Sequence, residues 1–219
     1  MSREDFLRRV RDGLKALPDD DRTVTLNGHR RHTTEESPRD RTAIIEQFVE
    51  RLEHHGARVR RLAEAQIPAA VYGALYEHRA KSVVAPEGLP DEWLETWSAN
   101  PDHQILDDHP QLSPEELGDA DAIVTSCAGA VADAGAVVLD GGPGQGRREA
   151  IPSCHICVVR AAQIDSSLPE VLDKLDSRRP ITWCGGPTAP SDAPASPGQG
   201  RHRQRQLVVL IVESDEISA

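Results

Sequence analysis

The sequence is poor in aromatic side chains: phenylalanine, tyrosine and tryptophan together make up 3% of its 219 residues. A hydrophobic core must therefore be built mainly from leucine, valine, isoleucine and alanine. Hydrophobic residues still reach 38%, which is enough for a packed domain and is unlike a disordered composition. The length fits one α/β domain with a helical extension, or at most two small domains.

Long apolar runs and an excess of basic residues are also missing. A membrane-spanning helix needs about 18 or more consecutive apolar residues, and the sequence has no such run. The N-terminal segment lacks the apolar stretch of a secretory signal and is too acidic for a transit peptide. We therefore expect a cytoplasmic protein without a membrane span. The formal net charge of −11 argues against nucleic-acid binding, although a local anion site is compatible with it.

The four cysteines do not form the framework of a small secreted protein. Cys154 and Cys157 make a C-x-x-C pair with His155 inside it. If this segment is a strand, the two thiols point to opposite faces, about 10 Å apart along the strand, and one metal ion could not bind both. No second C-x-x-C is present. We expect ordinary buried thiols and no metal site.

A glycine-rich loop in the middle of the chain is the most unusual chemical feature. Residues 140–148 have the sequence DGGPGQGRR and follow an apolar segment. Glycines permit positive φ angles and close approach of a ligand to the backbone, while Pro143 stiffens the turn. Arg147 and Arg148 place two permanent cations directly after the loop, which suits a carboxylate or a phosphate. A strand-end surface loop with two solvated arginines is equally compatible with this spacing.

This loop does not match the common nucleotide-binding motifs. A P-loop requires lysine and then serine or threonine after its last glycine, whereas Arg147 and Arg148 follow Gly146. A dinucleotide fingerprint starting at Gly142 would need glycine at position 147. Glycine density alone therefore indicates no particular nucleotide.

Periodicity divides the chain into an N-terminal extension and an α/β domain. Residues 2–17 are predicted to form an amphipathic helix, and residues 18–41 are polar and charged. Such a stretch is typical of a disordered linker or of an arm that becomes ordered on binding. We therefore assign residues 1–40 to a helix with a polar arm and residues 41–219 to the α/β domain.

Within the domain, helical and strand patterns alternate. Helices are expected at 42–55, 64–79, 89–97, after the Ser113 cap, and at 167–175. Strands are expected at 57–62, 82–85, 104–106, 122–124, 136–139, 156–159, 181–184 and 207–212. This alternation predicts a mostly parallel sheet flanked by helices. A hairpin-like passage at 121–140 adds antiparallel character, so we expect a mixed sheet; residues 187–200 are expected to form a flexible loop.

Several short runs resemble the lactate utilisation protein C family, also called the LUD domain family. They are residues 132–135 (ADAG), 137–148 (VVLDGGPGQGRR), Pro152 and 155–159 (HICVV). The resemblance is best over residues 120–160 and extends more weakly back to about residue 40 and on to the last strand. It implies a Rossmann-like α/β fold similar to those of ribose-5-phosphate isomerase and the CoA transferases.

The resemblance also suggests site residues. Asp133 stands where the family motif usually has glutamate, and His155 matches the family's histidine before the apolar strand. Both are catalytic candidates, while a structural ion pair for Asp133 and a buried core position for His155 are the alternatives. The expected ligand-binding residues are Gly135, Asp140, Gly141, Gly142, Gly144, Gln145, Gly146, Arg147, Arg148, Asp192, His202 and Arg205.

The region 186–206 departs from the family pattern. Asp192, His202 and Arg205 match it, but Pro190 and Pro194 stand where the pattern has threonine and glutamate. The missing glutamate argues against any activity that depends on it.

The resemblance implies a subunit of a lactate-utilisation system. Such a subunit would assist iron–sulfur partner proteins in oxidising L-lactate to pyruvate, with the clusters held by the partners, no cofactor in this chain, and a small anionic ligand as its own ligand. One alternative is a freestanding enzyme similar to CoA transferases or sugar-phosphate isomerases, with Asp133 or His155 as acid or base. Another is a non-catalytic module that docks a partner through residues 1–40. The sequence assigns no reaction to the chain itself.

Overall fold

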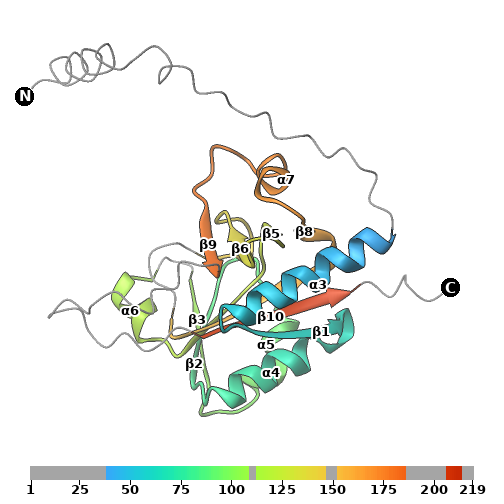
Figure 1. The fold of residues 1–219 in the computed structure, drawn as a ribbon. Helices are drawn as coiled ribbons and strands as arrows, with labels where there is room; N and C mark the ends of the chain where they lie inside the picture. Colours follow the sequence, from blue (N-terminus) through green and yellow to red (C-terminus); the bar gives the residue numbers. More distant parts are fainter. Residues whose placement is uncertain (1–37, 109–111, 147–151, 186–205, 214–219) are drawn as a thin grey trace, which may run out of the picture. The chain divides into compact units, whose positions relative to one another are not determined.

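The computed structural model describes residues 38–108, 112–146, 152–185 and 206–213 (Figure 1). The expected helix at 2–17, the polar arm up to residue 37 and the loop at 187–200 lie outside these ranges.

A six-stranded sheet forms the centre of the domain (Figure 1). Its strands are β1 (Arg58–Ala63), β2 (Ser82–Ala85), β3 (Gln104–Asp107), β4 (Ala122–Thr125), β7 (Cys154–Arg160) and β10 (Gln206–Glu213). They lie in the order β1-β10-β7-β4-β2-β3, and each neighbouring pair is parallel. Strands β7 and β10 are nearly continuous apolar runs because both of their faces are buried. The expected α/β class with a mostly parallel, helix-flanked sheet is confirmed.

The antiparallel pairing belongs to a second sheet rather than to the first. This sheet contains β5 (Gly129–Val131), β6 (Ala136–Leu139), β8 (Ile164–Asp165) and β9 (Thr182–Gly185), in the order β8-β5-β6-β9. β6 pairs antiparallel with both β5 and β9, and β5 pairs parallel with β8. The passage 121–140 is therefore split, because β4 joins the large sheet while β5 and β6 build the small one. Val137 and Leu139 of β6 contribute to the core beside the large sheet.

Helices cover both faces of the large sheet (Figure 1). They are α3 (Pro38–His54), α4 (Ile67–Glu77), α5 (Glu92–Ser98), α6 (Pro114–Asp119) and α7 (Leu168–Leu172), with short 3-10 turns η1 (Glu64–Gln66) and η2 (Ala161–Gln163). Each expected helix of the domain is present with shifted ends. None of the helices in the described ranges is long and apolar enough to cross a membrane.

Alternate residues of the central strands divide the core into two layers. On β7, Ile156 and Val158 pack with α4 and α5. Trp93 and Trp97 of α5 are buried in this layer, as expected. Val159 faces the opposite layer, where Phe48 of α3 and the small sheet lie. The small sheet is thus held against the large one by apolar contacts.

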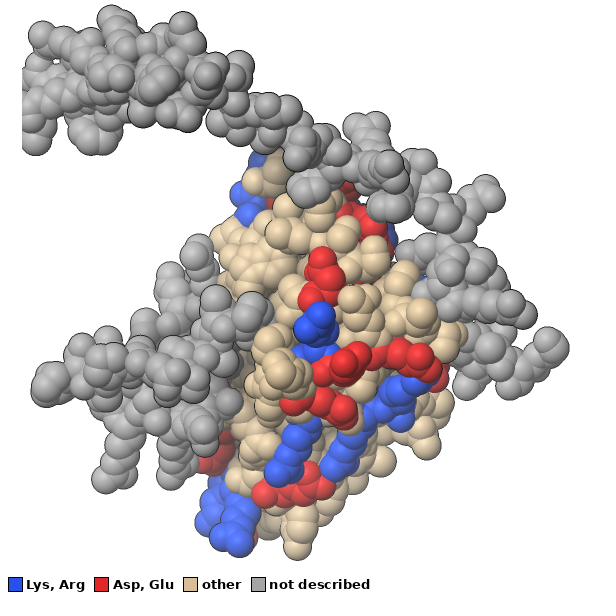
Figure 2. All heavy atoms as spheres, in the orientation of Figure 1, with Lys and Arg blue, Asp and Glu red and all other residues tan. Residues whose placement is uncertain are grey.

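Acidic and basic side chains are interspersed on the face shown in Figure 2. Glu77 of α4 accepts hydrogen bonds from Arg58 and Arg60, at 3.2 and 2.6 Å. Arg61 pairs with Glu213. The hydrogen bond from Arg60 lowers the pKa of the Glu77 carboxyl. These arginines are therefore matched with carboxylates and do not form a basic surface.

Candidate functional site

The glycine loop lies at the carboxyl edge of the large sheet. The Ser126 N–H, just after β4, donates to the Gly144 carbonyl at 2.7 Å. The Gly144 N–H in turn donates to the carbonyl of Glu87, which follows β2, also at 2.7 Å. Two strand ends therefore hold the loop in place. Ligands of open α/β sheets usually bind outside the carboxyl ends of the strands, so the loop is in a suitable position for one.

Asp140 organises the interior of this loop. One carboxylate oxygen accepts the Gly142 N–H at 2.9 Å, and the other lies 3.3 Å from Nη1 of Arg179. The Asp140 N–H donates to the side-chain oxygen of Gln145 at 2.7 Å. Asp140 is buried, whereas 48% of the Arg179 side chain is exposed. Hydrogen bonds within the loop thus hold its conformation, and the Arg179 cation lies at its surface.

Arg179 is the site residue that sequence reasoning missed. It lies in the segment between α7 and β9, 39 positions after Asp140. The adjacent pair Arg178 and Arg179 before a predicted strand was the only local signal, and it does not indicate which loop an arginine contacts. Arg179 reaches Asp140 because β9, which follows Arg179, pairs with β6, which precedes Asp140.

The loop's backbone donors are largely committed to the protein itself. The N–H groups of Gly142, Gly144 and Gln145 donate to Asp140, Glu87 and Gly142 respectively. Gly144 has a φ of 70°, and a Cβ there would lie 3.0 Å from the Ser126 hydroxyl, so glycine is needed for the close fit. Gly141 and Gly146 also have positive φ angles. An anion at this edge would therefore rely on side chains more than on these three amides.

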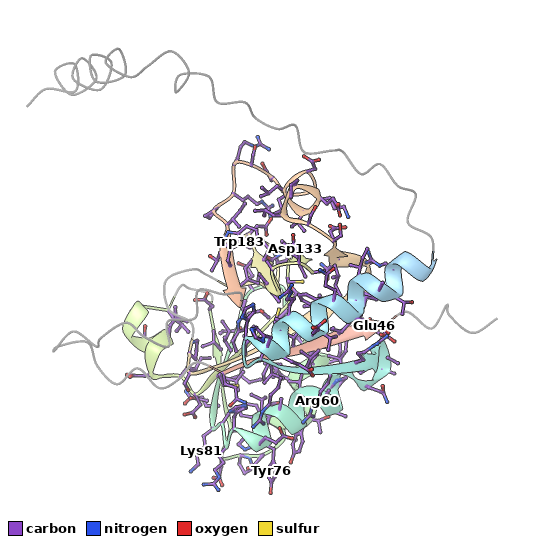
Figure 3. All side chains as sticks on the ribbon, viewed as in Figure 1. Glu46, Arg60, Tyr76, Lys81, Asp133 and Trp183 are labelled. Carbon is purple, nitrogen blue, oxygen red and sulfur yellow. The ribbon has the colours of Figure 1, made fainter. Side chains whose placement is uncertain are left out.

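Asp133 and Gly135 lie at the other end of β6. Asp133 is exposed in the turn between β5 and β6, where its N–H donates to the Ser166 carbonyl (Figure 3). The four residues of β6 separate it from the loop by about 14 Å, at about 3.4 Å per residue. Gly135 packs on α3, where a Cβ would lie 2.6 Å from that of Arg51. The fold does not bring Asp133 to the glycine loop.

His155 is buried on β7, and Nε2 of its ring lies 2.8 Å from the Thr125 hydroxyl of β4. Cys157 is on the same side of the strand and donates weakly to the Ser126 carbonyl at 3.6 Å. Burial, reinforced by the Cys127 thiol, raises the pKa of Cys157 well above its usual range. This thiol is thus protonated and is not a nucleophile at neutral pH.

Cys154 lies in the opposite core layer from Cys157, as the strand spacing predicts. Burial raises the pKa of Cys154 to about 12. Within the described ranges, no three histidine, cysteine, aspartate or glutamate side chains are grouped so that they could hold a metal ion.

Five expected ligand-binding residues lie outside the described ranges, and their roles stay predictions. They are Arg147, Arg148, Asp192, His202 and Arg205.

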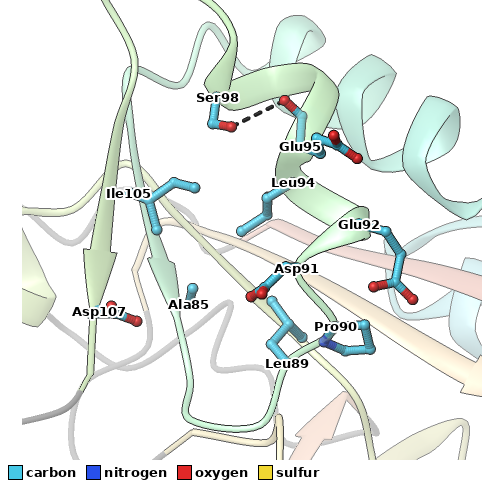
Figure 4. A pocket seen from close by; sticks show the side chains of 10 residues that line it. All are labelled: Ala85, Leu89, Pro90, Asp91, Glu92, Leu94, Glu95, Ser98, Ile105 and Asp107. Carbon is cyan, nitrogen blue, oxygen red and sulfur yellow. Dashed lines mark hydrogen bonds between the residues drawn. The ribbon is translucent and has the colours of Figure 1, made fainter.

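A groove of about 740 Å³ lies beside this site, between α5 and β3 (Figure 4). Asp91, Glu92, Glu95 and Asp107 line it, and no basic residue does. Its charge is therefore opposite to what an anionic ligand requires.

These features define an α/β domain that presents a braced glycine loop and an arginine at the carboxyl edge of its parallel sheet. The LUD domain family matches residues 45–212. Lactate utilization protein C of Deinococcus radiodurans is 36% identical over 182 residues, which cover 80% of this chain and 82% of that protein. A crystal structure of a duf162 family protein from Deinococcus radiodurans superposes with a TM-score of 0.62 and 33% identity, covering 78% of this chain and 98% of that one. The chain belongs to the LUD domain family, as its motifs predicted.

Proposed function

We propose that this protein works in lactate utilisation as a subunit that binds a small organic anion. The observation that supports this most strongly is the 36% identity to lactate utilization protein C across 80% of the chain. The family match also extends over both sheets, from α3 to β10. The whole domain, rather than one short motif, therefore supports the assignment.

The ligand in this proposal is a carboxylate such as L-lactate or pyruvate, held at the carboxyl edge of the large sheet. Arg179 is suited to this role because Asp140 fixes one side of its guanidinium while about half of the side chain remains exposed. A guanidinium has five N–H donors and can bind a carboxylate through two of them. Arg147 and Arg148, which follow the loop directly, are proposed to add further positive charge.

In this proposal the oxidation of L-lactate to pyruvate takes place on iron–sulfur partner proteins, and this chain assists them. The position of Asp133 supports a binding subunit over a freestanding acid–base enzyme. Its carboxylate lies at the hairpin tip, away from the loop and Arg179. A carboxylate can act as a base only within hydrogen-bond reach of the substrate proton.

A growth experiment tests the proposed pathway. Cells in which the gene for this chain has been deleted should not grow on L-lactate but should still grow on pyruvate, because only the oxidation of lactate to pyruvate is blocked. Expression of the wild-type chain should restore growth on lactate. Normal lactate growth and lactate consumption in the deletion strain would contradict the proposal.

A thermal-shift experiment on the purified chain tests the ligand site. L-lactate or pyruvate at about 100 times its Kd should add about 2.7 kcal/mol of stability. Arg179→Ala should abolish the shift because it removes the cation beside the loop. Arg178→Ala is the matched control, since Arg178 is 89% exposed and pairs with Asp176. Equal thermal shifts in the two variants would show that Arg179 is not part of the ligand site. If neither acid shifts the melting temperature of the wild type, the proposed anion binding is refuted, whereas the proposed role in lactate utilisation is not.

A further inference from the structure

The groove between α5 and β3 carries unpaired negative charge over an apolar floor (Figure 4). Ala85, Leu94 and Ile105 contribute to its floor. No ion pair among the described residues involves the four acidic residues that line the groove. This contrasts with the surface at the opposite edge of the large sheet, over β1 and α4, where arginines and glutamates are matched. Four uncompensated acidic groups favour a positively charged occupant.

One wall of the groove is the outermost strand of the large sheet. The N–H groups of Gln104 and Asp108 donate to the carbonyls of Lys81 and Ala85, at 2.7 and 3.2 Å. Because alternate residues of a strand face opposite neighbours, the backbone groups of Ile105 and Asp107 point away from β2. Among the described strands none pairs with this side of β3. The side chains of the same two residues line the groove.

We propose that β3 binds an extended, basic segment of a partner protein, which adds to the large sheet as its seventh strand. The exposed backbone groups of Ile105 and Asp107 would supply the hydrogen bonds of strand addition. Every second side chain of the added strand would face the groove, about 7 Å apart. Lysine or arginine at those positions would reach the carboxylates while their aliphatic stems cover the apolar floor.

The chemistry of the groove argues against other occupants. A single metal ion is disfavoured because the carboxylates do not form a group that could hold one. A second copy of this chain is disfavoured because pairing of two β3 edges would bring together two acidic grooves, neither of which is lined by a basic residue. The formal net charge of −11 adds to that repulsion.

Fluorescence anisotropy with a synthetic peptide tests the proposal. The probe is a fluorescein-labelled hexapeptide in which arginine and valine alternate. The full-length chain should bind it saturably, and 0.5 M salt should weaken binding because the charges are exposed. Asp107→Asn with Glu95→Gln should raise the Kd at least tenfold. Glu46→Gln with Glu50→Gln on α3 is the control, since it removes the same charge from an exposed helix surface and should leave the Kd unchanged.

A second measurement separates strand addition from simple charge attraction. The same peptide with methylated amides along one edge keeps its charge but cannot donate to the β3 carbonyls. Its affinity should fall at least tenfold, and only the unmethylated peptide should slow amide hydrogen exchange at Ile105 and Asp107. Equal binding of the two peptides, or equal binding by wild type and the Asp107/Glu95 variant, would overturn the proposal. Absence of binding would also overturn the proposal. The carboxylates would then be explained as charges that prevent the β3 edges of two molecules from pairing.

Discussion

Single residues fix how the small sheet meets the rest of the domain. Gly135, in the turn between β5 and β6, has a φ of 58° and lies directly against α3. A Cβ at this position would come within 2.8 Å of the Arg51 carbonyl carbon, which belongs to the helix backbone and cannot rotate away. The glycine is therefore required for packing, whatever its relation to a ligand.

Gly135→Ala should destabilise the protein by on the order of 2 kcal/mol, because it combines a strained backbone with a steric clash. Gly118→Ala is the matched control: Gly118 lies in α6, and a Cβ there meets no atom within 4 Å. The control should be neutral or stabilising by up to about 1 kcal/mol. Urea denaturation measures both free energies of unfolding. Equal values would show that the turn moves away from α3 without cost.

The buried thiol of Cys154 should make stability depend on alkaline pH. Its pKa is raised by burial from an ordinary 9.0 to about 12. The folded state thus retains a proton that the unfolded chain loses above pH 9. The resulting contribution to the free energy of unfolding is fully present below pH 9 and declines as the pH rises toward 12.

Comparison with Cys154→Ala isolates this effect. Between pH 9 and pH 11 the wild type should lose up to about 1.4 kcal/mol per pH unit more than the variant. Urea denaturation under reducing conditions at each pH gives the two slopes, and the difference at pH 7 corrects for the smaller side chain. Parallel slopes would indicate that Cys154 titrates normally in the folded protein.

At the scale of elements, the sequence predicted what depends on local pattern. The apolar spacing of α3, including the buried Phe48 and Leu52, and the apolar run of β10 were sufficient to place both elements. The three-residue strand β5 was missed because Gly-Ala-Val within an Ala/Gly-rich passage has no strand period to detect. Its strand character comes from pairing with β6 and β8, which are contacts that local sequence does not encode.

The same distinction applies to the candidate site. The glycine loop was visible because its composition is unusual over consecutive residues. The contact between Asp140 and Arg179 was not visible, because it depends on how β9 lies beside β6. The separation of Asp133 from the loop likewise follows from the direction of β6, which local sequence does not encode.

At the scale of the whole molecule, the last strand is an interior part of the sheet. β10 pairs with β1 on one side and with β7 on the other, and Val209, Leu210 and Ile211 are fully buried. β1 has no other strand partner in the described sheet. The large sheet is therefore completed by the last strand of the described residues, which lies between strands made much earlier in the chain.

Truncation tests this architecture. A chain that ends at residue 205 should fail to fold, because β1 and β7 lose their shared partner. A chain that ends at Glu213 keeps every described strand and should fold like the full-length protein. Circular dichroism and the cooperativity of urea unfolding distinguish the two results. Cooperative unfolding of the shorter chain would show that the sheet can close without β10.

The interior position of β10 also has a consequence for biosynthesis. Roughly 140 residues separate β1 from β10, and at about 5–20 residues per second the ribosome needs on the order of 10–30 seconds to make them. During that interval β1 has no partner, and from its own synthesis until β10 is made one edge of the apolar strand β7 has none either. An unpaired apolar strand invites association with other nascent chains. We therefore expect the position of β10 in the sheet to make the yield of folded protein depend on translation rate and on chaperones that bind extended apolar segments.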